Sequence, residues 1–292
     1  AMAQLYQFLA SGGEIQPLHA VRGVLDAQGR ALRRYDKDAP QAQKGDAVSF
    51  TSYCGGIPRH PDPFRYKFSW SPLGVLRALR APSTSIRGGA ARVVERPWHA
   101  IEPYDAPLPV PERFEIYPNR DSTEFVAPYG FSPDWTVRDF VRGTIRLEGW
   151  AEAWADIFAE VEGLTGPDGD ARLSQMADEL WAQHAYDPGE PDRVVLFVRL
   201  RAERGGAVVH DREWVLDAQG SAEGSAMAHL VSTPVALAAV AVEAGRFVPG
   251  VHAAPDDPGL VDEWLAEVGH VADHMARIDH MGDVAPATGA PS

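Results

Sequence analysis

Apolar and polar positions alternate with a period of two in several short stretches of the chain, and this period predicts β-strands. The clearest case is residues 47–55, in which Val48 and Phe50 lie on one face. The chain then reaches Gly55-Gly56, so we expect this strand to end in a tight turn. Further strands are expected at residues 91–95, 113–117, 139–147, 192–203 and 213–217.

A period of 3.6 residues predicts helices in other stretches. Ser71 is a suitable N-cap and Pro72 suits the first helical position, so a helix is expected over residues 71–81. Trp150 and Trp154 recur at helical spacing, and we assign them to a core rather than to a ligand platform. Further helices are expected at residues 150–161, 171–184, 225–243 and 259–277.

Strands followed by helices, without a regular βαβ alternation, predict an α+β fold in which helices pack mainly on one face of a sheet. A β-hairpin is expected around the turn sequence at residues 26–29. We expect residues 1–45 to form an otherwise irregular N-terminal segment, residues 46–283 to form the α+β domain, and residues 284–292 to form a disordered tail.

Composition narrows the classes of function. The 292 residues are 45% hydrophobic and carry a formal net charge of -14. This charge argues against general affinity for nucleic acid or an anionic membrane, because both need clustered lysine and arginine. Cys54 is the only cysteine, which excludes an intrachain disulfide and fits a cytoplasmic protein. No apolar run approaches the length of a membrane span, so no membrane partner is expected.

The stretch SYCGGIPRHPDPFRYKFSWSPLGVL combines prolines, basic side chains and hydroxyls. In an extended segment Lys67, Ser69 and Ser71 share one face, which leaves Phe68 and Trp70 to anchor the other face in the core. A lysine, two hydroxyls and a helix N-terminus together suit a carboxylate ligand. The alternative is an ordinary surface loop pinned by its aromatic side chains.

A second cluster, in the sequence EIYPNRDS, follows the end of a predicted strand. Arg120 can hold a carboxylate through two parallel hydrogen bonds, and Asp121 can accept from an ammonium group, so the cluster suits an amino acid. The alternative is that Asn119 or Asp121 closes a turn and that Arg120 pairs with Asp121 at the surface.

Other classes of site have little support. No GxGxxG motif follows a strand, so the dinucleotide-binding fingerprint is absent, and no GxSxG motif supports a hydrolase. His270 and His274 are one helical turn apart if the predicted helix is correct. Without an HExxH pattern or a nearby cysteine, a solvated helix face is the better interpretation, and no metal is predicted.

Four blocks of the sequence together resemble a known family. The blocks are SYCGGIPRHPDPFRYKFSWSPLGVL, EIYPNRDS, VRGTIRLEGW and STPVALAAVAVEAGRFVPGVHAAP. They occur in the family's order and lie within residues 46–255. They are similar to the C-terminal, substrate-binding domain of saccharopine reductase, the glutamate-forming saccharopine dehydrogenase.

The resemblance implies an α+β domain with a mixed sheet, which supplies the substrate site and the contacts of a homodimer. It also implies an N-terminal Rossmann domain that binds NADP(H). The reaction, part of lysine metabolism, joins glutamate to aminoadipate semialdehyde as an imine and reduces it by hydride transfer, or runs in reverse. The cofactor carries the chemistry and the protein positions it.

The resemblance also assigns roles to residues of this chain. Binding of the amino-acid substrate is expected for Lys67, Ser69, Ser71, Asn119, Arg120 and Asp121. A position beside the nicotinamide is expected for Cys54, Gly55 and Gly56.

The chain departs from the family pattern at its start, because residues 1–45 do not match the nucleotide domain that should precede this region. We therefore expect an excised domain or a truncated member that does not bind NADP(H) alone. Residues 235–242, VALAAVAV, are apolar all round. They are either buried in their own domain or, without the nucleotide domain, partly exposed or in a dimer contact.

Two other functions stay open. One is a catalytically silent domain that binds an amino acid or simply dimerises. The other is a relative of carboxynorspermidine or homospermidine synthase, although Arg120 favours substrates with carboxylates over plain polyamines.

Overall fold

The computed structural model describes residues 23–25, 31–34, 44–247, 250, 254–255 and 257–281. The strands are β1 (Gly23–Leu25), β2 (Ala31–Arg34), β3 (Ala47–Pro58), β4 (Ser83–Arg87), β5 (Ala90–Val94), β6 (Glu102–Ala106), β7 (Glu112–Pro118), β8 (Thr136–Leu147), β9 (Asp192–Arg204), β10 (Ala207–Gln219) and β11 (His274–Asp279). The α-helices are α2 (Pro72–Arg80), α3 (Trp150–Ala153), α4 (Ala155–Gly163), α5 (Gly166–His184), α6 (Ala226–Glu243) and α7 (Pro258–His270).

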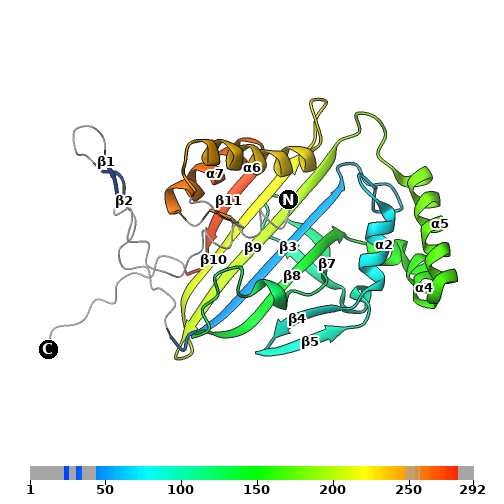
Figure 1. Ribbon diagram of the computed structural model, residues 1–292, viewed down its shortest axis with the longest axis horizontal. Coiled ribbons are helices and arrows are strands. Elements are labelled where there is room, and N and C mark those ends of the chain that lie inside the picture. The colour runs from blue at the N-terminus through cyan, green and yellow to red at the C-terminus, as the bar shows by residue number, and fades with distance from the viewer. Residues whose placement is uncertain are drawn as a thin grey trace.

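Nine of these strands form one mixed sheet. Its main path runs β11-β10-β9-β3-β8-β4-β5, and β7 also pairs with β8 and carries β6. The central strand β3 is antiparallel to β9 and parallel to β8. Figure 1 shows α6 and α7 over the part of the sheet formed by β9–β11. Helices α2, α4 and α5 lie at the right of the view, beyond β7 and β8. The predicted α+β class, with helices mainly on one face, is confirmed.

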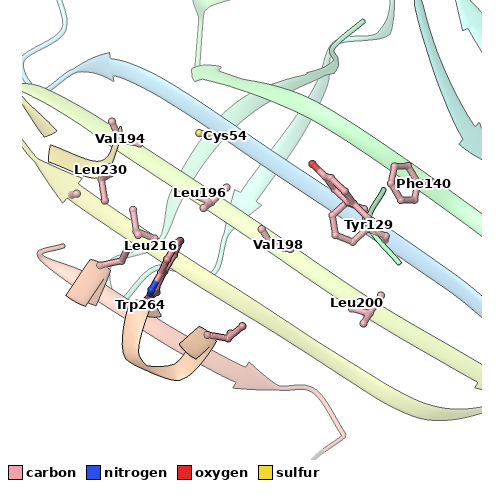
Figure 2. Packing of buried hydrophobic residues seen from close by; sticks show 14 of the residues in the cluster. Cys54, Tyr129, Phe140, Val194, Leu196, Val198, Leu200, Leu216, Leu230 and Trp264 are labelled. Atoms are coloured by element: carbon pink, nitrogen blue, oxygen red, sulfur yellow. The ribbon is translucent and has the colours of Figure 1, made fainter. Parts of the chain in front are cut away.

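The first hydrophobic cluster lies between the sheet and the α6–α7 pair (Figure 2). Leu196 and Val198 of β9 pack there with Leu230 of α6 and Trp264 of α7, and each of these side chains is at most 7% exposed. Burial of one such side chain stabilises a fold by about 2 kcal/mol. This cluster therefore holds α6 and α7 against the sheet.

A second cluster joins the other helices to the end of the β3–α2 loop. Phe68, Trp150 and Trp154 are each 0% exposed within it. The predicted apolar stripe is therefore core, as expected, although the helix it belongs to is broken at Trp154 into α3 and α4.

The third cluster lies on the opposite face of the sheet, where the sheet curls upon itself. Tyr104 of β6 contacts the rings of Tyr53 and Phe197. Its hydroxyl donates a hydrogen bond of 3.0 Å to Glu213 of β10. Because β6 reaches β10 across this face, the strands cover much of their own apolar surface without a helical layer.

The turn predicted at Gly55-Gly56 is wrong, because β3 continues through both glycines to Pro58. A Cβ at Gly55 would collide with the carbonyl oxygen of Ile145 in β8, and a Cβ at Gly56 would lie 2.6 Å from the Met227 Cε. The glycines therefore allow close packing within an extended strand rather than a change of direction.

The predicted helix at residues 259–277 is correct as far as His270 and wrong beyond it. Helix α7 ends at His270, and β11 then pairs antiparallel with β10. Pairing with the open edge of β10 satisfies the backbone groups of this segment, so tertiary structure overrides its helical pattern. The short strands β4 and β6 were not predicted from the sequence.

The predicted N-terminal hairpin is confirmed by the antiparallel pairing of β1 with β2. Its turn at residues 26–29 and the predicted tail at residues 284–292 lie outside the described residues. The domain boundaries at residues 45 and 283 stay predictions.

Helix α6 is only partly covered. Val235, Val240 and Val242 are 52%, 64% and 63% exposed, so complete burial of residues 235–242 is wrong and partial exposure is confirmed. Within the described part of the chain, α6 is also the one helix with the length and composition of a membrane span. A single such helix is weak evidence for membrane crossing, and α6 rests on β9 and α7 through Leu230 and Ala241.

The close approach of β3 to β8 predicts a specific intolerance to substitution. Gly55→Ala is expected to lower the free energy of unfolding by about 3 kcal/mol, because the new methyl group must displace the Ile145 carbonyl. Gly163→Ala is the matched control, since no atom lies within 4 Å of the added carbon at the end of α4. Urea unfolding of both variants tests this, and equal stabilities would contradict it.

His210 predicts an acid-sensitive step in stability. Burial, aided by the Arg212 guanidinium, lowers the pKa of His210 to about 4. The fold therefore favours the neutral form of His210. The contribution of neutral, buried His210 to stability is fully present above about pH 6.5 and is lost as the pH falls through about 4, because the unfolded chain takes up the proton first. His210→Leu should reduce the stability lost over that window by roughly 2–3 kcal/mol. Urea unfolding at pH 7 and pH 4.5 measures this, with His270→Leu at the exposed end of α7 as control.

Candidate functional site

The face of the sheet that carries the helices also carries a row of polar side chains on β8. Phe140 points into the cluster beneath α6 and α7, and alternation along the strand puts Arg142, Thr144 and Arg146 on the same face. Arg142 and Arg146 are separated by four residues, or roughly 13 Å along a strand. The Arg142 guanidinium lies 3.6 Å from the centre of the Phe125 ring. The row therefore runs from the cluster beneath α6 and α7 toward the cluster that joins helices α2–α5.

Arg146 is a buried cation, only 7% exposed. Its guanidinium carbon lies 4.6 Å from the ring centre of Tyr66, 5.4 Å from that of Trp150 and 5.7 Å from that of Tyr117. Its Nη1 donates to the Ile145 carbonyl at 3.1 Å. Its Nε is buried without a hydrogen-bond partner among the described residues.

No carboxylate of the described residues forms an ion pair with Arg146. Buried arginines are normally paired with an acid, because transfer of an unpaired charge out of water is costly. Aromatic faces recover part of this cost but supply no negative charge. The arrangement can therefore bind an anion, and a carboxylate matches the planar fork of arginine best.

Cys54 belongs to the first hydrophobic cluster (Figure 2). It lies opposite Thr144 in the register of β3 and β8, and therefore on the same face as Arg146. Burial raises the pKa of Cys54 to about 12, although the Arg146 charge opposes this. The thiol is therefore neutral at physiological pH and is not an activated nucleophile. The positions of Cys54, Gly55 and Gly56 beside a nicotinamide stay predictions.

The Asn119–Ser122 segment forms a turn at the end of β7, and backbone hydrogen bonds attach it to both β8 and β4. The Asn119 N–H donates to the Arg142 carbonyl at 2.9 Å, and the Ser122 N–H donates to the Thr84 carbonyl at 2.8 Å. Asp121 accepts from the backbone and the hydroxyl of Thr123 at 2.7 and 2.5 Å. Asp121 thus closes the turn, as in the alternative interpretation.

Arg120 does not pair with Asp121. Its side chain is exposed and makes no hydrogen bond or ion pair with the described part of the chain. Its φ of 51° lies in the left-handed region, which favours glycine and costs other residues about 1 kcal/mol or more. Roles for Asn119, Arg120 and Asp121 in substrate binding stay predictions.

The three polar residues predicted on the β3–α2 loop have different surroundings. The Lys67 ammonium pairs with Glu190 at 2.6 Å, and these side chains are only 15% and 17% exposed. Ser71 caps α2 by accepting from the Gly74 N–H at 3.3 Å, as predicted. Ser69 is exposed, and so is Trp70, which is 52% exposed rather than anchored in the core. Binding roles for Lys67, Ser69 and Ser71 stay predictions.

The loop from α5 to β9 carries Tyr186 and leads to Asp192, and it was not singled out from the sequence. Burial raises the pKa of Tyr186 on this loop, and the Asp192 and Glu190 carboxylates raise it further, whereas the Arg146 charge opposes the shift. The Asp192 carboxylate accepts from the N–H groups of Ala226 and Met227 at 2.6 and 3.0 Å, so it caps the N-terminus of α6.

Arg146 had a signal in the sequence that was not used. The block VRGTIRLEGW places a charged residue within a predicted buried strand, which is unusual for a face that must pack. The metal edge considered at His270 and His274 loses its geometric basis, because β11 begins at His274. Among the described residues, no three metal-ligating side chains lie together.

The fold and the site together define a class: an α+β domain that can bind a small anionic ligand on the helix-bearing face of a mixed sheet, without a nucleotide-binding motif. The sequence profile of the saccharopine dehydrogenase C-terminal domain family matches residues 23–271. The chain therefore belongs to the saccharopine dehydrogenase C-terminal domain family.

Curated relatives agree with this assignment. The mitochondrial alpha-aminoadipic semialdehyde synthase of Bos taurus is 25% identical over 261 residues, which cover 65% of this chain and 28% of that protein. The saccharopine dehydrogenase (NADP(+), L-glutamate-forming) of Saccharomyces cerevisiae is 41% identical over 119 residues, which cover 37% of this chain and 24% of that protein. The matches thus span about a quarter of each relative, and these relatives are oxidoreductases of lysine metabolism.

A solved structure is similar as well. The apo saccharopine dehydrogenase (L-Glu forming) from Saccharomyces cerevisiae superposes with a TM-score of 0.62 at 26% sequence identity. The match covers 80% of this chain and 68% of that one. The resemblance inferred from the four sequence blocks is therefore confirmed.

The unpaired charge of Arg146 predicts an unusual effect on stability. Arg146→Met should leave the free energy of unfolding unchanged or raise it by about 1–3 kcal/mol, because it removes a buried charge that no carboxylate of the described residues balances. Arg193→Met is the matched control, since Arg193 pairs with Asp217 at 2.7 Å and Glu112 at 2.8 Å. The control should lose about 1–3 kcal/mol. Urea unfolding of both variants measures this. A loss of stability for Arg146→Met that exceeds the loss for Arg193→Met would contradict the prediction and show that Arg146 stabilises the fold.

Proposed function

We propose that this chain is the substrate-binding and dimerisation portion of an NADP-dependent saccharopine dehydrogenase-like oxidoreductase. The enzyme acts on the CH–NH or imine bond of a carboxylated secondary amine. The family membership supports the reaction class. The named relative from Saccharomyces cerevisiae acts with NADP(+) and forms L-glutamate, and we extend that chemistry to the parent protein of this chain.

The observation that carries the proposal is the buried guanidinium of Arg146. A ligand carboxylate at this position would form the ion pair that the described residues do not supply. The pair would form in a region shielded by Tyr66, Tyr117 and Trp150, where water competes weakly for the charges. A substrate with carboxylates suits this site better than a plain polyamine.

Arg120 provides a second reason to expect an acidic ligand. The left-handed backbone conformation of Arg120 lowers stability. Its side chain makes no hydrogen bond or ion pair with the described residues that would offset this cost. Strained backbone of this kind concentrates at functional sites. We assign Arg120 to a second carboxylate of the ligand, beside Asn119 and Asp121.

The cofactor and the partner domains follow from the family. NADP(H) would be held mainly by a Rossmann domain of the parent protein, and the exposed apolar side of α6 is a suitable surface for that domain, since Val235, Val240 and Val242 are otherwise in water. In the proposed enzyme the cofactor supplies the hydride. The residues of this chain bind and orient the substrate, and the parent protein is a cytoplasmic homodimer.

Ligand binding by the 292-residue chain tests the proposal. Titration calorimetry with L-saccharopine should show binding, whereas NADPH should not bind measurably to this chain. Arg120→Gly should weaken L-saccharopine binding about tenfold or more, because a charge-assisted hydrogen-bond pair is lost. The same variant should gain up to about 1 kcal/mol of stability, because glycine relieves the left-handed backbone.

Arg65→Gly is the matched control for this test. Arg65 is also exposed and has a φ of 60°, so its replacement should give a similar gain in stability with no change in affinity. If wild-type chain binds neither L-saccharopine nor L-glutamate, the chain is a silent domain. If a carboxylate-free polyamine binds more tightly than L-saccharopine, the substrate class is wrong.

A further inference from the structure

The segment that joins β7 to β8 packs on the helix-bearing face of the sheet and carries Tyr129. Its start is fastened to β8, because the Arg142 N–H donates to the Ser122 hydroxyl at 3.0 Å. Further along, the Tyr129 N–H donates to the Phe125 carbonyl at 2.9 Å. The Tyr129 ring meets the ring of Phe50 edge to face, with ring centres 5.6 Å apart. Tyr129 is therefore held in one position over β3.

The hydroxyl of Tyr129 is buried without a hydrogen-bond partner. The side chain is 4% exposed, and its oxygen has no partner among the described residues. Figure 2 shows this oxygen pointing away from Phe140, toward the part of β3 that carries Cys54. A buried hydroxyl lowers stability when nothing accepts its proton, so its position calls for an acceptor that the described residues do not supply.

A second hydroxyl without a partner lies on the same part of β3. Ser52 is 0% exposed, and its Oγ has no hydrogen-bond partner among the described residues. Ser52 stands between Phe50 and Cys54, and alternation along β3 puts all three on the helix-bearing face. Because Tyr129 contacts Phe50 and its oxygen points toward Cys54, this oxygen lies over Ser52.

Arg142 brings a positive charge to the same place. It lies opposite Ser52 in the register of β3 and β8. Its guanidinium lies 3.6 Å from the centre of the Phe125 ring, and the centre of the Tyr129 ring is 5.7 Å from that of Phe125. A guanidinium has only donors, so it cannot accept the proton of either hydroxyl. Three groups that can donate suit an anionic acceptor, and a carboxylate fits them best.

This group of donors is well separated from Arg146. Arg142 and Arg146 lie roughly 13 Å apart along β8, so donors at the two positions cannot serve one carboxylate. The Asn119 N–H donates to the Arg142 carbonyl, which puts the turn that carries Arg120 at the Arg142 end. Arg142 and Thr144 are half-buried rather than buried, so the row between the two ends is not sealed from solvent.

Resting on the proposed function, we propose that Tyr129 and Ser52 are further ligand-binding residues, whose hydroxyls donate to the second carboxylate of the ligand at the Arg142 end of the row, while Arg146 binds the first. The ligand is then an elongated amino acid that carries carboxylates near both ends. A short dicarboxylate such as L-glutamate reaches only one end.

Hydroxyls are suitable donors at this position. Burial raises the pKa of Tyr129 to about 12, although the Arg142 charge opposes this shift, so the hydroxyl keeps its proton at physiological pH. Each hydroxyl adds a hydrogen bond to the bound carboxylate without burying another charge.

Calorimetry of L-saccharopine binding to the 292-residue chain tests the inference. Tyr129→Phe should weaken binding about tenfold, since one hydrogen bond to a charged group is lost. The thermal unfolding midpoint of the free chain should stay unchanged or rise, because the hydroxyl has no partner among the described residues.

Tyr104→Phe is the matched control. Its hydroxyl donates to Glu213 on the opposite face of the sheet. This variant should keep the affinity and lower the unfolding midpoint. The same pattern in Tyr129→Phe would overturn the ligand-binding role of Tyr129.

Double-mutant cycles test which carboxylate each residue serves. Tyr129→Phe combined with Ser52→Ala should cost less affinity than the sum of the single changes, because both hydroxyls serve one group. Tyr129→Phe combined with Arg146→Met should give additive losses, because the two side chains serve opposite ends of the ligand. Coupling of Tyr129 to Arg146 as strong as its coupling to Ser52 would overturn the two-ended arrangement.

The outcomes distinguish this inference from the proposed function. Wild-type binding that depends on Arg146 but is unchanged in Tyr129→Phe overturns the role of Tyr129 alone. Absence of L-saccharopine binding by wild-type chain overturns the proposed function and this inference together.

Discussion

The parallel pairing of β3 with β8 is the contact on which the rest of the molecule depends. It sets Cys54 opposite Thr144. It also fixes Arg142 and Arg146 of β8 on the helix-bearing face, between the α6–α7 pair and helices α2–α5. The strands meet closely only because Gly55 has no side chain to strike the Ile145 carbonyl. A parallel partner cannot be reached through a hairpin, so the chain must cross over between them, and this crossover contains α2 and the NRDS turn.

Charge is treated differently on the two faces of the sheet. On the face away from the helices, the β9 arginines are matched with acids of β10, as in Arg193 with Asp217 and Arg199 with Asp211. On the helix-bearing face, Asp192 and Glu190 serve a helix end and a lysine, while Arg146 has aromatic neighbours. An acidic chain thus keeps a local positive site, which favours selective binding of an anion over general attraction.

The local patterns predicted most of the fold and only part of the site. Ser71 capped its helix as expected, and the Trp150–Trp154 stripe proved to be core, because caps and apolar stripes act within a few residues. The turn at Gly55-Gly56 was wrong because the reason for those glycines lies on other elements of the fold. Lys67 was read as a ligand group, but its partner Glu190 is 123 residues away, and no spacing rule connects them.

The sequence by itself determined the α+β class, the family, the Ser71 helix cap, the N-terminal hairpin and the overall acidity, since each depends on composition, short periods or extended blocks of similarity. Only the tertiary structure decided that β11 leaves its helical pattern to pair with β10, that α6 keeps an exposed apolar side, and that Arg146 is buried among aromatic rings without an acid from the described residues. The physical reason is that burial and charge pairing are properties of neighbours in space. Those neighbours are chosen by strand pairing across long stretches of chain, which local sequence does not encode.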